Sequence, residues 1–301
     1  MKLIKSLPYS QKLAPYVFIG PFVITFLLFF IYPVISTIIM SFQNVVPGQT
    51  AFVGIDNFKH LINNDFQRAI INSVIYTLLT LAVLIPVPMI LAVFLSSKTM
   101  IARNFFRSVL FLPALVSIVV GGFTFRLIFG EMPTALLNTI LSVFGIGPVK
   151  WLGGPEAWTT FLALLVLCCW RWMGVNTMYY IAGLQSIPEE LYESASIDGA
   201  NALHKFRYIT VPMLMPTTTY ILTISIFGGM SMFLESYMLF NGNRSPGGQG
   251  LTIVGYLYRH GWEQGNIGFG SAIGLALLIV TFGVNMLQLR ATGLFGKGEK
   301  A

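Results

Sequence analysis

Six long apolar segments alternate with short polar connections along this chain. They cover residues 16–40, 73–95, 108–129, 158–182, 213–234 and 268–289. A helix of about 20 apolar residues crosses the hydrocarbon core of a bilayer, so each segment is long enough to span a membrane. The pattern predicts an all-α polytopic membrane protein with six transmembrane helices. Pro33, Pro86, Pro88 and Pro113 lie inside these segments and predict kinks, because neighbouring helices can satisfy the carbonyls that proline frees.

Composition supports this interpretation and excludes other classes. The 301 residues are 55% hydrophobic and 10% charged, whereas a soluble domain carries about 25% charge. The net charge of +7 is spread over many loops, unlike the clustered basic face of a nucleic-acid-binding protein. Cys168 and Cys169 are adjacent within the fourth segment and are expected to pack there, without a redox or metal role.

The basic residues also predict the topology, because loops on the cytoplasmic side are enriched in Lys and Arg. One alternate set of connections is rich in these residues and the other is poor. The rich set holds Lys2, Lys5, Lys12, Lys98, Arg103, Arg107, Lys205, Arg207, Arg290, Lys297 and Lys300, and the poor set holds Lys59, Arg68, Lys150, Arg244 and Arg259. Both termini, and the loop at 187–209, are therefore expected on the cytoplasmic side.

That loop gathers charge in a chain that has little of it. Its sequence, SIPEELYESASIDGANALHKFRYITVPMLMP, runs over residues 186–216. Ser186 and Glu189 have the spacing of a capping box, and Gly199 allows a turn with positive φ between two short helices. The second helix is expected to carry Leu203, Phe206 and Ile209 on one side. The residues alone leave two possibilities open: a docking element for a partner, or a solvated connection between two spans.

A resemblance decides between them. The stretch Glu193-Ser-Ala195-x-x-Asp198-Gly199-Ala200, followed by Phe206, Ile209, Pro212 and Pro216, resembles the EAA signature of the membrane subunits of bacterial ABC importers. Ser194 replaces the first alanine of the usual triplet. The segments PFVITFLLFFIYPVISTIIMSF, FVGIDNF and RSVLFLP are similar, in order and spacing, to the carbohydrate permeases of the maltose-transporter kind.

This resemblance implies the fold, the partners and the coupling residues. It implies one transmembrane permease domain over 1–301 with the type I ABC importer permease fold, in the bacterial cytoplasmic (inner) membrane. In that family the EAA loop forms coupling helices that seat in a cytoplasmic ATPase. The residues expected to couple are Glu193, Ala195, Asp198, Gly199, Ala200, Leu203 and Phe206. The implied partners are two ATPase subunits, a second related permease and an extracytoplasmic sugar-binding protein. No cofactor is expected, because the chain has no GxxxxGK[ST] loop and ATP would be bound by the partner subunits.

Spans four and five offer the chemistry that a sugar needs, namely aromatic faces, hydroxyl or amide partners and small residues. The expected path residues are Trp170, Arg171, Gly174, Thr177, Ser225, Gly229, Met232 and Glu235. By resemblance, Gly174, Thr177, Ser225, Gly229 and Met232 match positions lining a mid-membrane site in maltose-type permeases. Gly229 and Met232 stand where the maltose permease has asparagines, which favours a looser cavity. Helix packing is the alternative explanation for the small residues.

Other classes of function fit less well. His60, His204 and His260 all lie in loops, and no pair of acids is placed for catalysis at membrane depth, so an enzyme is not expected. An ion-coupled secondary transporter usually has charged groups inside its spans, and Arg171 is the strongest candidate here. Its alternative position is nearer an interface. The function expected is therefore a permease subunit of an ATP-driven sugar or oligosaccharide importer. A polyol or glycerol phosphate permease is the alternative within the family, and an ion-coupled secondary transporter is the alternative outside it.

Overall fold

The computed structural model describes residues 13–97, 99–154, 157–242 and 245–293. Seven of the basic residues used to predict topology lie outside these ranges: Lys2, Lys5, Lys12, Lys98, Arg244, Lys297 and Lys300. Within the described ranges, four helical runs are long and apolar enough to span a membrane. Two bent helix pairs bring the number of candidate spans to as many as six, in agreement with the sequence pattern. The four runs are Ala14–Met40, Asn64–Ser96, Trp158–Leu184 and Ile267–Ala291, and the pairs are Arg103–Leu115 with Ile118–Ile128 and Ala202–Met213 with Met215–Met230.

The chain divides into two compact units, of which the first comprises residues 1–62 and 257–276. In it a long apolar run is followed by a two-stranded antiparallel hairpin, in which Gln43 pairs with Phe52. The Nδ2 of Asn57, in the FVGIDNF motif, donates to the backbone oxygens of Ser41 and Gln43, both at 2.9 Å. The motif therefore fixes the hairpin to the end of the first span. The elements are α2 (Ala14–Phe26), a π-helical turn (Leu27–Ile31), α3 (Tyr32–Ser41), β1 (Gln43–Val46), β2 (Gln49–Phe52), α4 (Asp56–His60), a second π-helical turn (Arg259–Glu263) and the first part of α17 (Ile267–Ala291).

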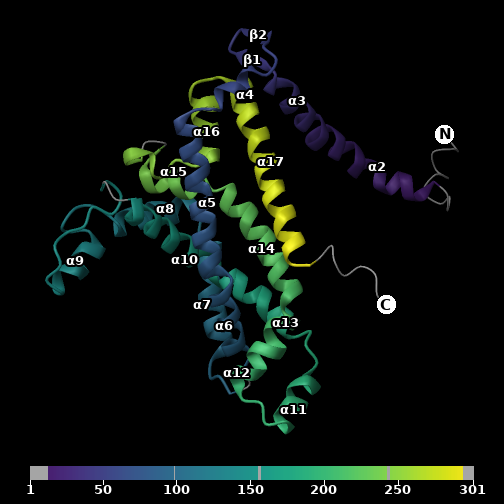
Figure 1. Ribbon diagram of the computed structural model, residues 1–301, viewed down its shortest axis with the longest axis vertical. Coiled ribbons are helices and arrows are strands. Elements are labelled where there is room, and N and C mark those ends of the chain that lie inside the picture. The colour runs from purple at the N-terminus through teal and green to yellow at the C-terminus, as the bar shows by residue number, and fades with distance from the viewer. Residues whose placement is uncertain (1–12, 98, 155–156, 243–244, 294–301) are drawn as a thin grey trace. The chain divides into compact units, whose positions relative to one another are not determined.

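The second unit comprises residues 63–256 and 277–301. Its centre is α10, which packs against α5, α6, α7 and α14 (Figure 1). The elements are α5 (Asn64–Leu84), α6 (Pro86–Ser96), α7 (Arg103–Leu115), α8 (Ile118–Ile128), α9 (Leu136–Val143), α10 (Ala157–Leu184), α11 (Glu189–Ile197), α12 (Ala202–Lys205), a π-helical turn (Phe206–Thr210), α13 (Val211–Met213), α14 (Met215–Met230), α15 (Leu234–Phe240), a 3-10 turn (Pro246–Gly248), most of α16 (Ile253–Tyr258) and the end of α17.

Several helices bend or widen near prolines, as the sequence predicts. The helical run through α5 and α6 breaks at Ile85, just before Pro86. The pair α7 and α8 is bent by 97°, shortly after Pro113. π-helical turns end two residues before Pro33 and Pro212, where a wider turn accommodates the missing N–H and the proline ring.

The fifth span differs from its predicted form. The sequence predicts a short helix after Gly199 and a separate span beginning at Met213. The structure instead has one helical run from Ala202 to Met213, which bends by 64° into α14. The reason is the π-helical turn at Phe206–Thr210, which lets the helix pass Pro212 without ending. The loop at 187–209 is thus directly continuous with a membrane helix.

Candidate functional site

A cavity of about 390 Å³ lies between α5, α10 and α14 in the second unit. Its volume falls within the range of ordinary small-molecule pockets. Aromatic, hydroxyl and amide side chains line it, which are the groups that a neutral polyhydroxyl compound needs. The principal ones are Tyr76, Thr80, Trp172, Asn176, Tyr179 and Tyr220.

Three of the residues predicted for the substrate path line this cavity: Ser225, Gly229 and Glu235. The two neighbouring glycines of α14 differ in their surroundings. A Cβ on Gly229 would lie 2.5 Å from Oγ1 of Thr77, so this glycine allows α14 to pack closely against α5. A Cβ on Gly228 would meet nothing within 4 Å. Gly228 therefore gives the cavity its open space on this helix.

Four other predicted path residues have packing contacts. A Cβ on Gly174 would overlap the carbonyl oxygen of Leu110, so the glycine permits the close crossing of α10 and α7. Thr177 is fully buried and donates to the carbonyl of Met173 in its own helix. Met232 belongs to the hydrophobic core, and the ring of Trp170 packs on that of Phe125, with centroids 5.3 Å apart. A role for these four in transport stays a prediction.

Arg171 lies near the middle of α10, not at a helix end. Its Nη1 donates to the carbonyl of Val116 at 2.6 Å, which is one of the groups freed where α7 ends before α8. Further along α10, Asn176 also satisfies a freed carbonyl. Its Nδ2 donates to the carbonyl of Leu84 at the break between α5 and α6. Polar side chains of α10 thus satisfy the broken backbone of two neighbouring helices, as the membrane interior requires.

A second hollow of about 400 Å³ is lined by Arg171, Trp172, Ser231 and Glu235. Trp172 and Glu235 also line the first cavity, so the two spaces adjoin. The guanidinium of Arg171 lies 5.7 Å from the centroid of the Trp172 ring. Among the described residues, no three His, Cys, Asp or Glu side chains are grouped so that they could hold a metal ion.

Sequence reasoning missed the contribution of α5. It sought path residues in spans four and five alone, whereas Tyr76 and Thr80 line the cavity from the second span. A signal for them existed: Ser73, Tyr76, Thr77 and Thr80 form a polar stripe at helical spacing within an apolar segment.

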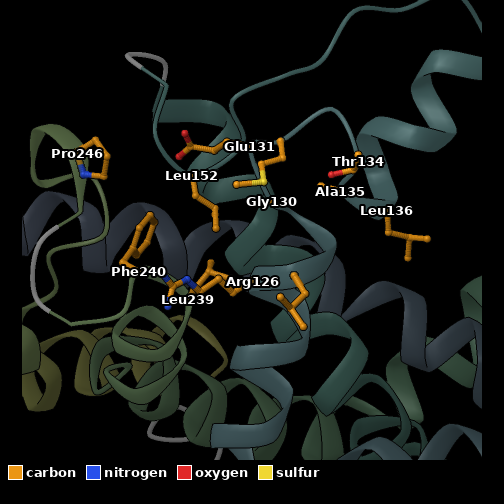
Figure 2. Close-up of a pocket in the computed structure, with 12 residues that line it drawn as sticks. Arg126, Gly130, Glu131, Thr134, Ala135, Leu136, Leu152, Leu239, Phe240 and Pro246 are labelled. Atoms are coloured by element: carbon orange, nitrogen blue, oxygen red, sulfur yellow. The ribbon is translucent and has the colours of Figure 1, made fainter.

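A third hollow, of about 650 Å³, lies where α8, α9 and α15 end or begin. Figure 2 shows Arg126 and Glu131 among its lining, with Leu136 of α9 on one side and Phe240 of α15 on another. Most of the remaining lining is apolar. No prediction from the sequence concerned this region.

The loop at 187–209 has the two-helix form predicted for it. Helix α11 ends in a Schellman motif, in which the N–H groups of Gly199 and Ala200 donate to the carbonyls of Ser196 and Ala195. Gly199 has a φ of +78°, so the turn requires the freedom of glycine. Asn201 then caps α12, since its Oδ1 accepts from the N–H of His204.

The start of α11 corrects the predicted capping box. Pro188 occupies the N-cap position and makes no side-chain cap. The hydroxyl of Ser186 donates instead to the carbonyl of Gly183, at the end of α10. Because proline already fixes the backbone before Glu189, the serine is left to finish the preceding helix.

The side chains of the loop divide into two sets. Tyr192, Phe206 and Ile209 pack against the core of the membrane helices, and the hydroxyl of Tyr192 bonds to that of buried Thr210 at 2.9 Å. The other set is exposed: Ile197 and Leu203 are 87% and 72% accessible. Phe206 and Leu203, predicted to act together, therefore face different surroundings. Glu193, Asp198 and Gly199 are exposed, and Ala195 and Ala200 are half-buried.

Comparison with known proteins identifies the family. Residues 51–298 match the family model described as a binding-protein-dependent transport system inner membrane component. The arabinooligosaccharides transport system permease protein AraP of Bacillus subtilis (strain 168) is 52% identical, over 98% of this chain and 93% of the relative. The AraP of Halalkalibacterium halodurans is 46% identical, over 97% and 91%.

The fold has also been seen before. A crystal structure of a bacterial ABC transporter involved in the import of the acidic polysaccharide alginate contains a chain that superposes with a TM-score of 0.82. The match is 24% identical in sequence and covers 99% of this chain and 100% of the other. The predicted permease fold and the predicted ABC importer family are therefore confirmed, and the family is one of multi-pass inner-membrane transport components.

Proposed function

Since this chain belongs to the family of binding-protein-dependent transport system inner membrane components, we propose that it is the permease subunit of an ABC importer for arabinooligosaccharides. The observation that carries the proposal is the 52% identity to an AraP protein over nearly the full length of both chains. A second AraP at 46% supports it. The chain is a transport subunit, and we propose no enzymatic activity for it.

The chemistry of the cavity supports a neutral saccharide. Tyr76, Trp172 and Tyr220 offer ring faces, and Thr80 and Asn176 offer hydroxyl and amide groups. None of the described side chains that line this cavity is basic, and Glu235 adds a carboxylate. A phosphorylated solute such as glycerol phosphate is usually bound by cationic side chains. The lining therefore disfavours a glycerol phosphate permease, the alternative within the family.

The loop at 187–209 supports a coupling role. Its exposed apolar side chains, Ile197 and Leu203, stand beside exposed Glu193 and Asp198, which suits docking into a cleft on an ATPase. Its other side is bonded to the membrane helices through Tyr192 and Thr210. In this proposal the loop and both termini face the cytoplasm. ATP is bound and hydrolysed by partner subunits, and this chain itself needs no cofactor.

The remaining partners follow from the same assignment. A second, related permease would complete the path across the membrane, and an extracytoplasmic binding protein would deliver the oligosaccharide. In this proposal a single permease forms half of the path, and the second permease would line the other half. Selectivity would then be shared between the binding protein and the side chains named above.

The proposal is tested by uptake into vesicles that contain the complete importer and its binding protein. We expect ATP-dependent uptake of arabinotriose, with little competition from maltotriose or glycerol phosphate. Gly228→Leu should fill the cavity and reduce uptake severalfold, with a larger loss for longer chains. Gly283→Leu is the matched control, since a Cβ there also meets nothing within 4 Å and Gly283 lies on α17, away from the cavity lining.

Two results would overturn the assignment. Preferential ATP-dependent uptake of glycerol phosphate would replace the substrate class. Equal uptake by the Gly228→Leu and Gly283→Leu variants would show that the solute does not pass through this cavity.

A further inference from the structure

The connection between α8 and α10 contains a short helix with an uncovered apolar face. Leu136, Ile140 and Val143 of α9 and Phe144, which follows its last turn, share one face and are all exposed. Val143 and Phe144 reach 79% and 74% accessibility. From Met132 to Val149 the sequence contains no charged residue, while Glu131 and Lys150 stand at its two ends. Soluble proteins rarely expose a contiguous apolar face of this kind to water.

The polar groups of this connection are satisfied from within. Asn138 is 1% exposed and lies at the centre of the α9 loop, which we define as residues 130–151. The two hydrogens of its Nδ2 are shared among the carbonyls of Gly130, Met132 and Val149, which lie 3.1–3.2 Å away. Its Oδ1 accepts from the N–H of Val149 and from the indole N–H of Trp151.

These five bonds answer a requirement of the hydrocarbon environment. Irregular backbone has orphan carbonyls and N–H groups, which water can satisfy at a surface but lipid cannot. In the α9 loop the buried amide of Asn138 forms hydrogen bonds with backbone groups from both ends of the connection. The apolar face can then meet hydrocarbon without leaving unpaired polar groups beside it.

The placement of α9 agrees with this. It follows α8, whose side chains Val120, Phe123 and Leu127 are also exposed and apolar. Figure 1 shows α9 below α8 along the long axis, at a height within the run of α5 and α6, which is a membrane-spanning helix by length and composition. The charged groups Arg126 and Glu131 line the hollow beside the end of α8, and of the apolar face only Leu136 borders that hollow (Figure 2).

We infer that the α9 loop inserts its apolar face into the lipid bilayer, in the leaflet opposite to the one faced by the loop at 187–209. The apolar face contacts lipid at the boundary between headgroups and acyl chains, where a short amphipathic helix buries its apolar side. A soluble binding protein would be expected to meet a polar rim around an apolar centre, and residues 132–149 offer no charged rim. The inference holds whichever solute the importer carries.

Spin labelling of the complete importer in vesicles of phosphatidylcholine and phosphatidylglycerol tests this. Cys168 and Cys169 are first replaced by alanine and the background is checked for uptake. Single cysteines are then introduced by Ile140→Cys and Phe144→Cys on the apolar face, and by Ser142→Cys at its polar edge as the matched control. We expect labels at 140 and 144 to collide more with oxygen than with a water-soluble nickel chelate, and the label at 142 to show the reverse preference.

Each other result overturns the inference. Nickel accessibility at 140 and 144 equal to that at 142 would place the face in water. Loss of oxygen accessibility when the sugar-loaded binding protein is added would make this face a docking surface for that protein. Low accessibility to both reagents in the resting importer would place it against the second permease.

Discussion

The loop at 187–209 and the α9 loop are both connections between membrane helices, and both expose apolar side chains, yet they are built in opposite ways. The first is rich in charge and is tied to the helical core by Tyr192, Phe206 and Ile209. The second is almost uncharged and is held together internally by Asn138. One can pass on a displacement, because its contacts lead into the membrane helices. The other can keep its own shape, because its bonds close on themselves.

The difference shows that exposure alone does not tell what covers an apolar surface. Around Ile197 and Leu203 the neighbouring carboxylates and hydroxyls form a polar rim, which is the usual composition of a protein interface. Beside Val143 and Phe144 stand only the hydroxyls of Thr139 and Ser142, without any charged residue. The arrangement of polar groups beside the patch therefore distinguishes a protein partner from a lipid one.

The largest effect is expected from removing the side-chain amide of Asn138, which holds the α9 loop together. Asn138→Leu keeps the volume but leaves five backbone and indole groups without their partner, and each orphaned buried group costs about 1–3 kcal/mol. We expect the complex to lose its native structure at a clearly lower temperature in a thermal unfolding experiment.

The neighbouring substitution Thr139→Val is the control, because Thr139 is exposed on the same helix. Equal thermal stability of the Asn138→Leu and Thr139→Val variants would show that Asn138 does not hold this loop together.

A smaller energetic effect, confined to the other loop, is expected from Gly199→Val. A β-branched residue at a φ of +78° is strained by roughly 1–2 kcal/mol, although a Cβ there meets no neighbour within 4 Å. The chain should still insert, while uptake and co-purification of the ATPase fall strongly. Gly199→Asn should retain more activity, since asparagine adopts this conformation more readily. Wild-type uptake by the valine variant, with the ATPase bound as usual, would contradict the coupling role.

The smallest effect is expected from Tyr192→Phe, which removes one hydroxyl and keeps the ring in the core. The lost bond to Thr210 is worth about 1 kcal/mol, so coupling should weaken by no more than about fivefold. The readout is the number of sugars carried per ATP hydrolysed, measured beside total ATPase activity. Tyr208→Phe serves for comparison, because Tyr208 is exposed. If both variants give the same ratio of sugar to ATP, the Tyr192–Thr210 bond does not position the loop.

Much of the fold follows from the sequence because a membrane simplifies the problem. Apolar length locates the helices, and Pro86 and Pro113 indicate where two of them bend. The 97° angle after α7 could not be predicted, since the carbonyl of Val116 that is freed there accepts a hydrogen bond from Arg171, fifty-five residues away in the chain. The α9 loop was missed for a similar reason: the pairing of Asn138 with both ends of the connection is a tertiary property.

The candidate site was predictable by kind of residue more than by position. Ser225 and Glu235 were chosen for chemistry that suits a sugar, and the structure places both at the cavity. Gly174 was chosen by the same reasoning, but its missing side chain serves a helix crossing. A sequence shows that a residue is small, and only the neighbouring helix shows whether the vacant volume is filled by backbone or open to a solute.

The bonds from Arg171 and Asn176 have a mechanical consequence for the membrane helices. Both donors stand on α10, and each holds the backbone at the point where a neighbouring span is interrupted. The breaks in the second and third spans are therefore both hydrogen-bonded to one continuous helix, α10. A tilt of α10 is expected to move both breaks together, which would couple the rearrangement of the second and third spans within a single subunit.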